Sequence, residues 1–532
     1  MMSKFRYICL FVLTCLAAAV AVSCAGDLGN YDYRELDEPV ISGLETQVSV
    51  MREESLELVP VISGGLGDDA YTYEWKAIGQ DGDYVEEILG TDKNLSVSEV
   101  KLLPGIYSLY YTLTEKETGV YWRKEMTLTV STPMSEGWMV LCSEEGRARL
   151  DFVSDVKASG KKYYIDVLKD NKDMPVFENP RKIMWLSSNT DSSSPYYLLA
   201  GSGATRLGKD SFGWTEEYDL KYEMGSNVSV APYDIVSAWS LKLMVNGTDV
   251  HYCSIISDDI GGMYGSPVNK DFRAAPYIGT NAVLNSMAMV AVFLLYDIDN
   301  KCFMAYSPML ADKEFNEQPL ADMYRMEHIA TSQDASNVIT SGFESYPEGM
   351  EFIYMENTRW DPINAGMGVT YTVLSDGDER YVYGIQLGDI LRLSSSKYAI
   401  VRSYKGDISR CTDIGKAEFF AFSSIRSYMY YSVGNKIYGV SLDESPDDSR
   451  VMLELPGNIT MMKFNLYQKN DEQRRSNDLI VGFEKGGEGQ FWVYEGGFDA
   501  NGDFSNVTPL KYDGGSEGKF SEIVDVCYKE RN

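Results

Sequence analysis

Residues 430–440 read Tyr-Tyr-Ser-Val-Gly-Asn-Lys-Ile-Tyr-Gly-Val: an apolar strand, a tight polar turn and a second apolar strand. Residues 294–304 repeat this arrangement, and both segments carry Asn-Lys at the turn with an aromatic residue two positions later. Glycine and asparagine tolerate the left-handed backbone that two-residue hairpin turns need. Each segment therefore predicts a β-hairpin.

The same pattern recurs along the C-terminal part of the chain. The predicted hairpins lie at residues 138–153, 196–207, 241–253, 292–306, 371–385, 428–442 and 479–494. A strand-rich unit that recurs at intervals of roughly 50–60 residues, with almost no helical periodicity, is typical of a β-propeller. We predict a propeller of about seven blades over residues 134–532, with a last strand at residues 520–528 that closes the ring against the first blade. Six or eight blades, or two stacked sandwich domains, are the alternatives.

Residues 40–132 show a different pattern, in which apolar side chains alternate with polar ones, as at Tyr71, Tyr73 and Trp75. Turn sequences rich in glycine and aspartate separate these short strands. Such spacing predicts a small β-sandwich of the PKD or immunoglobulin-like type, with Trp75 in its core. An exposed ligand platform is the alternative role for this domain. The predicted fold class of the whole chain is all-β.

The N-terminus has the layout of a bacterial secretory signal. Lys4 and Arg6 precede an apolar run at residues 7–22, and small residues lead from this run to Cys24. The run is shorter than the roughly 20 residues that a membrane-spanning helix needs. We therefore predict a lipoprotein signal peptide at residues 1–23.

Lipidation of Cys24 is the first site prediction. Its thiol would carry a diacylglyceryl group and its freed amino group a third acyl chain, which together make anchoring effectively permanent. Residues 24–39 are polar and acidic and are expected to form a tether. Ala25 follows the cysteine in place of the aspartate that often keeps lipoproteins in an inner membrane. The expected location is therefore the outer membrane.

The charge of the chain narrows the range of partners. Removal of the signal peptide leaves 46 basic and 79 acidic residues and a net charge of −33. Such a surface repels phosphate backbones and anionic headgroups, so we expect neither nucleic-acid binding nor peripheral membrane docking. With only His251 and His328 and no Cys-x-x-Cys pair, the chain offers few zinc ligands. No cofactor is predicted.

Three features of the sequence bear on catalysis or metal binding. Residues 514–518 match Gly-x-Ser-x-Gly, but they lack the strand before and the helix after that a nucleophile elbow needs, which predicts a loop. Residues 499–503 resemble the start of a calcium loop, yet Leu510 occupies the position of the bidentate glutamate, so a hairpin tip is expected and a looser calcium site is the alternative. Paired carboxylates of a propeller glycosidase could come from any of the 79 acids. We predict no catalytic residue and no metal ligand.

Two tryptophans lie in polar, turn-rich surroundings. Trp214 stands beside Thr215-Glu216-Glu217, and Trp360 stands between Arg359 and Asp361. A flat ring beside carboxylates and a guanidinium suits the apolar face and the hydroxyls of a sugar. Trp214 and Trp360 are the predicted ligand-binding residues, with ordinary packing as the alternative for each.

Three short motifs follow one another along the chain: Asp-Leu-Gly-Asn-Tyr-Asp-Tyr at residues 27–33, Tyr-Glu-Trp at residues 73–75, and Ser-Glu-Gly-Trp-Met-Val-Leu at residues 135–141. With Cys24 in front of them, this order resembles the PKD-like lipoproteins of Bacteroidota. The resemblance implies a PKD-like domain, a propeller-like region, and an accessory role in glycan uptake of the starch-utilisation type. The implied partners are a glycan and an outer-membrane transporter complex.

The sequence therefore predicts a non-enzymatic outer-membrane lipoprotein that binds a glycan or assists a glycan-uptake system. Cell-surface display is expected, with the periplasmic face as the alternative because few acids follow Cys24. A propeller glycosidase or lyase that uses Asp and Glu is the second hypothesis. A structural subunit that contacts proteins and has no small-molecule ligand is the third.

Overall fold

The computed structural model of the chain describes residues 38–79, 86–154, 161–186, 196–209, 211–238, 241–254, 262–280, 292–306, 323–326, 346–362, 368–387, 400–443, 446, 448–466, 475–496, 504 and 507–530. The chain divides into two compact units, Met1–Ser131 and Thr132–Asn532. Within the described ranges no helix is long and apolar enough to cross a membrane. The described ranges contain the short 3-10 helices η1 (Asp68–Ala70), η2 (Glu216–Tyr218), η3 (Leu220–Glu223) and η6 (Ile414–Lys416), and a further 3-10 turn at residues 475–477.

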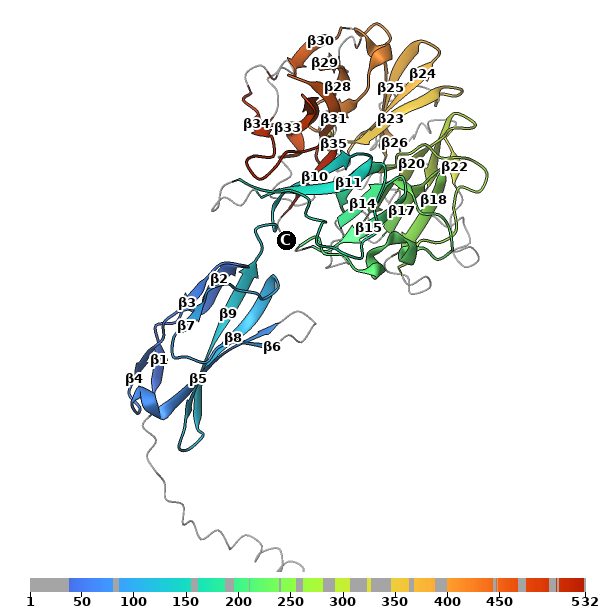
Figure 1. Cartoon of the computed structure of the whole chain (residues 1–532). Coiled ribbons are helices and arrows are strands. Elements are labelled where there is room, and N and C mark those ends of the chain that lie inside the picture. The colour runs from blue at the N-terminus through green and yellow to red at the C-terminus, as the bar shows by residue number, and fades with distance from the viewer. Residues whose placement is uncertain are drawn as a thin grey trace, which may run out of the picture. The chain divides into compact units, whose positions relative to one another are not determined.

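The first unit is a β-sandwich (Figure 1). Its five-stranded sheet has the order β2 (Gln47–Met51), β9 (Tyr121–Ser131), β8 (Gly105–Glu115), β5 (Tyr71–Gly79) and β6 (Glu86–Gly90), with β2 parallel to β9. Two small antiparallel sheets complete the unit: β1 (Val40–Ser42) with β4 (Val61–Ser63), and β3 (Leu56–Leu58) with β7 (Leu95–Val97).

The core of the sandwich forms around Trp75. The Trp75 side chain is fully buried, its ring centroid lies 4.3 Å from that of Tyr111, and its Nε1 donates a hydrogen bond to the carbonyl oxygen of Asp92 at 3.0 Å. The hydrogen bond satisfies the polar edge of a ring that is otherwise surrounded by apolar side chains. The prediction of an immunoglobulin-like or PKD-like sandwich with a core tryptophan is confirmed.

The second unit contains seven sheets in the described part of the chain. Each sheet is given from its first strand outward: the first is β35 (Glu522–Lys529), β10 (Gly137–Glu144), β11 (Arg147–Ser154), β12 (Lys162–Tyr164); the second β13 (Pro180–Trp185), β14 (Tyr196–Ala200), β15 (Gly203–Leu207); and the third β16 (Pro232–Ala238), β17 (Leu241–Asn246), β18 (Asp249–Ser254). The fourth is β19 (Gly279–Thr280), β20 (Phe293–Asp297), β21 (Cys302–Tyr306), β22 (Tyr324–Arg325), and the fifth is β23 (Glu351–Asn357), β24 (Thr370–Asp376), β25 (Glu379–Leu387), β26 (Ile400–Asp407). The sixth is β27 (Phe420–Phe422), β28 (Tyr428–Val433), β29 (Lys436–Ser441), β30 (Arg450–Glu454), and the seventh is β31 (Asn458–Phe464), β32 (Leu479–Lys485), β33 (Glu488–Tyr494), β34 (Leu510–Tyr512).

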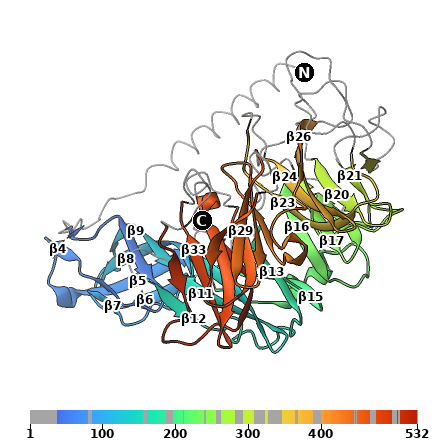
Figure 2. The same ribbon diagram turned by 90° about the horizontal axis from the view of Figure 1, so that it is seen from above.

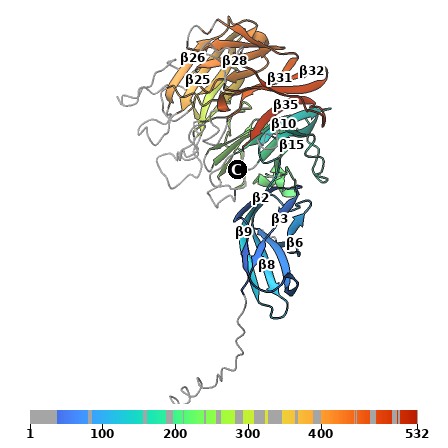
Figure 3. The same cartoon turned by 90° about the vertical axis from the view of Figure 1, so that its left-hand side faces the viewer.

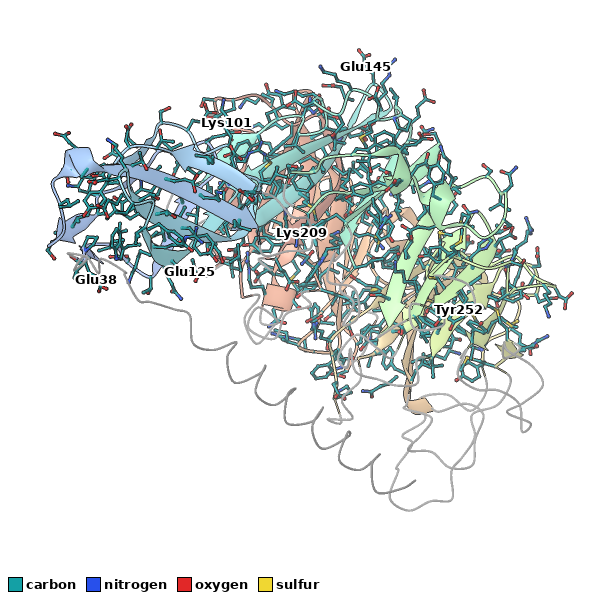
Figure 4. All side chains as sticks on the ribbon, turned by 90° about the horizontal axis from the view of Figure 1, so that it is seen from below. Glu38, Lys101, Glu125, Glu145, Lys209 and Tyr252 are labelled. Atoms are coloured by element: carbon teal, nitrogen blue, oxygen red, sulfur yellow. The ribbon has the colours of Figure 1, made fainter. Side chains whose placement is uncertain are left out.

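Each predicted hairpin is present as two neighbouring strands of one of these sheets. The turn between β10 and β11 illustrates the local chemistry, because Glu145 and Gly146 have φ angles of 52° and 82°. Both angles lie in the left-handed region that two-residue turns require. Figure 4 shows Glu145 at the tip of this hairpin, away from the side chains packed between the strands.

The seven sheets form a closed ring. Seven clusters of buried apolar side chains each lie between two consecutive sheets, and the last of them joins the seventh sheet to the first. The first strands of the sheets are also neighbours: β35 contacts β13 and β31, and the chain of contacts continues through β19, β23 and β27. The green, yellow, orange and red sheets follow one another around an axis in Figure 1, and Figure 2 shows the same sheets from above. This is the predicted β-propeller, with seven blades.

The last strand closes the ring. β35 pairs antiparallel with β10, so that Trp138 lies opposite Tyr528, and the two strands lie side by side in Figure 3. Trp138 is fully buried, and its Nε1 donates to the Tyr512 hydroxyl of the seventh sheet at 3.2 Å. β35 covers the edge of β10 and becomes the first strand of the first sheet, which confirms the prediction for this segment.

We expect Val526→Asp to open this closure. Val526 on β35 is fully buried opposite Val140, and an aspartate there would place an unpaired charge in an apolar cluster. The expected loss is about 3 kcal/mol or more of unfolding free energy, measured by urea denaturation. The control Glu522→Gln changes an exposed side chain of the same strand and should leave the midpoint unchanged. Equal midpoints for both variants would contradict closure by β35.

Candidate functional site

Charged side chains from five sheets converge where the first strands meet. We call Lys182, Asp234, Glu356, Lys463 and Asp525 the axial cluster; they lie on β13, β16, β23, β31 and β35. The charges of Lys463 and Lys182 act on the Glu356 carboxyl, and those of Asp234 and Asp525 act on the Lys182 ammonium. Interactions of this kind between strands of five different sheets require the side chains to gather around the axis.

Two ion pairs bridge neighbouring sheets within the axial cluster. Lys182 Nζ donates to Asp234 Oδ1 at 2.5 Å, and Lys463 Nζ donates to Asp525 Oδ1. The second oxygen of Asp525 accepts from the backbone N–H of Ile183 at 3.0 Å, so this carboxylate connects the seventh, first and second sheets. The aspartate side chains are 8% and 9% exposed and the lysine side chains 35% and 22%. Solvent therefore reaches the cluster through its lysines.

Within the described residues, the two lysines of the cluster form ion pairs with Asp234 and Asp525 and not with Glu356. Its Oε2 accepts a hydrogen bond from the backbone N–H of Phe422 at 2.7 Å. Enclosure by protein atoms raises the pKa of Glu356 to about 8, and this effect outweighs the Phe422 N–H and the charges of Lys463 and Lys182, which lower it. Most Glu356 carboxyls therefore carry a proton at neutral pH and can donate a hydrogen bond.

Two tyrosines extend the axial cluster. The rings of Tyr277 and Tyr354 meet edge to face with centroids 5.2 Å apart, and Tyr354 also stacks on Phe420 at 5.7 Å. Burial raises the pKa of both hydroxyls, as do the charges of Glu356 and Asp234. Both hydroxyls therefore stay protonated at neutral pH. In the described part of the chain no hydrogen bond satisfies either of them.

The axial cluster combines hydrogen-bond donors, acceptors and aromatic surface. Lysine ammonium groups, tyrosine hydroxyls and a protonated glutamate can donate, while aspartate oxygens accept. Its two lysines and two aspartates balance in charge when Glu356 is protonated. No group of three or more His, Cys, Asp or Glu side chains in the described ranges is arranged to hold a metal ion. The chemistry that this arrangement suits is recognition of a polar, uncharged molecule.

The predicted ligand residue Trp214 packs against its own sheet. Its Nε1 donates to Thr205 Oγ1 of β15 at 2.9 Å, and its backbone N–H donates to Asn171 Oδ1 at 2.9 Å. The ring remains partly exposed. Its indole N–H is therefore engaged within the protein, and only the exposed ring surface is available to a ligand.

The predicted ligand residue Trp360 lies just after β23. It is partly buried against the apolar cluster between the fifth and sixth sheets. With Tyr371 and Tyr404 it lines a hollow that has room for at most about one water molecule. Trp214 and Trp360 belong to the second and fifth sheets, and no contact in the described ranges joins them. They do not form one site with each other.

The remaining candidates from the sequence have these positions. Cys24, His328 and residues 499–503 lie outside the described residues. Ser516 lies on an exposed turn between β34 and β35, and His251 is buried in β18 with Nδ1 2.8 Å from the Gly265 carbonyl oxygen. Neither residue has the surroundings of a catalytic nucleophile or base.

Sequence reasoning missed the axial cluster, although two of its members interrupt apolar runs in the sequence. Asp525 interrupts the apolar run from Ile523 to Val526, and Lys463 interrupts Met461-Met462-Lys463-Phe464. A single charge within an apolar strand is costly unless it finds a partner. Such charges in the first strand of several repeats could have indicated a shared polar site at the axis.

Comparison with known proteins identifies the N-terminal region. Residues 24–178 match the model of the PKD-like family. The match covers the sandwich and continues through β12 of the first propeller sheet. This part of the chain is PKD-like, as the sequence resemblance implied. No curated protein matches the chain.

Several solved structures are similar to the chain. A quinonprotein alcohol dehydrogenase-like protein from Bacteroides thetaiotaomicron is 13% identical and covers 94% of this chain and 100% of its own, with a TM-score of 0.40. The PKD domain of human KIAA0319 is 22% identical over 20% of this chain and 93% of its own, with a TM-score of 0.17. Hsv2p of Kluyveromyces lactis is 9% identical over 66% of this chain and 94% of its own, with a TM-score of 0.30. With TM-scores below 0.5, these similarities assign no function to the chain.

The raised pKa of Glu356 predicts a pH-dependent loss of stability. The folded-state pKa of about 8 lies above the ordinary value of 4.5, so the contribution of this group is fully present below pH 4.5 and is lost as the pH rises toward 8. Glu356→Gln does not titrate. Its unfolding free energy relative to the wild type should increase by on the order of 2–4 kcal/mol between pH 5 and pH 8 and then level off.

Urea denaturation at pH 5, 7 and 9 measures this effect. The matched control is Glu351→Gln, which changes an exposed glutamate on the same strand. Its pH profile should follow the wild type. Parallel profiles for Glu356→Gln and the wild type would show that Glu356 ionises normally in the folded chain.

Proposed function

We propose that this chain, which is PKD-like over residues 24–178, is a non-enzymatic binding or accessory component of a glycan-uptake system, held at the outer membrane by a lipid on Cys24. One observation carries the binding role: polar side chains from several blades gather at the propeller axis and keep part of their surface open to solvent. A propeller that served only as a scaffold would gain more stability from apolar side chains at these positions.

A glycan matches the chemistry of the axial cluster. Sugar hydroxyls both donate and accept hydrogen bonds, and sugar rings have apolar faces that stack on aromatic side chains. The cluster offers Asp234 as an acceptor, Lys182 as a donor, and the rings of Tyr277 and Tyr354. Trp214 and Trp360 are proposed as further, separate contacts, since both rings are partly exposed.

The lipid anchor and the tether would attach the chain to the outer membrane. Residues 24–39 would hold the PKD-like sandwich away from the membrane, and the sandwich would space the propeller from the tether. The partner that this arrangement suits is an outer-membrane transporter complex at the cell surface, with the periplasmic face as the alternative. The acidic surface of the chain disfavours binding to anionic headgroups, so the acyl chains would supply the attachment.

A glycosidase is the second candidate, and Glu356 favours it. A carboxyl that is protonated at neutral pH is suited to act as a general acid, and two further carboxylates, Asp234 and Asp525, share the axis. Both aspartates are engaged in ion pairs with lysines, which lowers their readiness to act as base or nucleophile. Binding without hydrolysis is therefore the favoured function.

Replacement of Cys24 tests the anchor. Cys24→Ala removes the thiol that accepts the diacylglyceryl group, so the protein should no longer partition with the outer membrane. The measurement is membrane fractionation with labelled fatty acid. The control Cys142→Ala changes a buried cysteine of β10 and should leave labelling unchanged. Unchanged labelling of Cys24→Ala would refute lipidation.

A pull-down tests the binding role. The soluble chain from Gly26 to Asn532 keeps every described residue and is incubated with immobilised plant, microbial and host glycans, while released reducing sugar is assayed in parallel. We expect retention without release, and weaker retention of Tyr354→Phe, which lacks one axial hydroxyl. Release that disappears in Glu356→Gln would support the glycosidase. Neither retention nor release would leave a structural subunit as the function.

Separate variants test the two tryptophans in the same assay. If Trp214→Ala or Trp360→Ala loses retention while Tyr354→Phe keeps it, the binding site lies at that tryptophan and away from the axis.

A further inference from the structure

We propose that the axial cluster binds the uncharged, hydroxyl-rich end group of a glycan chain and rejects the same sugar when it carries a carboxylate. This inference rests on the proposed function, because it names the class of glycan that the site would accept. It follows from the hydrogen-bonding capacity, the charge balance and the position of the cluster.

The first step is the hydrogen-bonding capacity that the cluster leaves unused. Within the described ranges, Glu356 receives one bond at Oε2, from the Phe422 N–H, and the hydroxyls of Tyr277 and Tyr354 receive none. Lys182 and Lys463 each donate one of their three N–H groups to an aspartate. None of these atoms is among the buried side-chain atoms that lack a partner, so water can reach them and a ligand would take the place of that water. A ligand with several hydroxyls can satisfy donors and acceptors together.

The second step is charge. Two lysines and two aspartates of the axial cluster cancel, and Glu356 adds no charge while it is protonated. A neutral sugar leaves this balance intact. A carboxylate would add a negative charge next to Asp234 and Asp525, in surroundings where burial of a charge costs several kcal/mol unless it is paired. Both lysines are already paired, and the whole chain carries a net charge of −31, which opposes the approach of an anion.

The third step is the apolar surface beside these polar groups. Tyr354 makes ring contact with Tyr277 of the fourth sheet and with Phe420 of the sixth. Phe420 is buried in the apolar cluster between the fifth and sixth sheets, so the partly exposed Tyr277 and Tyr354 supply the accessible ring surface. An aromatic wall next to hydrogen-bonding groups suits a pyranose ring, whose C–H face is apolar and whose edge carries hydroxyls.

The fourth step is access. The first strands of the seven sheets surround the cluster, and neighbouring sheets are sealed by apolar clusters. A glycan chain therefore has no route sideways between blades and approaches along the axis. The proposed route along the axis suits a chain end, so the sugar bound at the axial groups would be a terminal one.

Glu356 gives the site a pH dependence. The charged and titratable groups around it are Lys182, Lys463, Asp234 and Asp525 with the hydroxyls of Tyr277 and Tyr354, and the raised pKa values of both tyrosines keep these hydroxyls protonated through pH 9. When Glu356 ionises it loses its donor and becomes the third carboxylate of the cluster. Binding should therefore weaken as the pH passes about 8.

Calorimetry with matched sugar pairs tests the proposal on the chain from Gly26 to Asn532. The probes are cello-oligosaccharides and manno-oligosaccharides, each compared with the counterpart oxidised at C6 to the uronate. We expect binding of a neutral member at pH 7 and affinity at least roughly tenfold lower for its uronate. Affinity of the wild type should fall roughly tenfold between pH 7 and pH 9, as the protonated fraction of Glu356 falls.

Variants separate the inference from the proposed function. Glu356→Gln keeps a donor that does not titrate and should bind equally at pH 7 and pH 9, while the control Glu351→Gln should follow the wild type. Equal binding of both members of a pair, tighter binding of the uronate, or a pH profile unchanged by Glu356→Gln would overturn the inference and leave glycan binding standing. Failure of every probe to bind would overturn both.

Discussion

The pairing of β35 with β10 is the constraint on which the second unit depends. A propeller sheet cannot bury both faces alone, and each apolar cluster needs two neighbouring sheets. Because β35 supplies the first strand of the first sheet, the ring is complete only when this strand is in place. Trp138 then contacts Tyr528 and Tyr512 and joins the first sheet to the seventh.

The same strand assembles the polar centre of the ring. Asp525 accepts hydrogen bonds from Lys463 on the seventh sheet and from the Ile183 backbone on the second sheet. One carboxylate of the first sheet therefore joins both neighbouring sheets. Ion pairs of this kind add little net stability compared with apolar packing, but their directional bonds favour one register over others. Ring closure and the geometry of the candidate site are therefore set by one element.

Features formed by residues close together in the chain could be predicted from the sequence, whereas features formed by residues far apart in the chain could not. The hairpins could be predicted because a turn such as Gly434-Asn435 and its flanking strands are adjacent in the chain, and Trp75 because strand alternation places it on an inward face. The axial cluster could not, since Lys182, Glu356 and Asp525 meet only after distant sheets have been arranged in a ring. The protonation of Glu356 depends in turn on that enclosure.

The distance along the chain between β10 and β35 bears on how the protein is made. Residues of the sandwich contact one another locally and can fold as soon as they emerge from the ribosome, whereas the first propeller sheet waits for its final strand until synthesis is nearly finished. During that interval the exposed edge of β10 can pair with a wrong strand, including one from another chain. The arrangement favours a slow final folding step and a need for protection by chaperones until the last strand arrives.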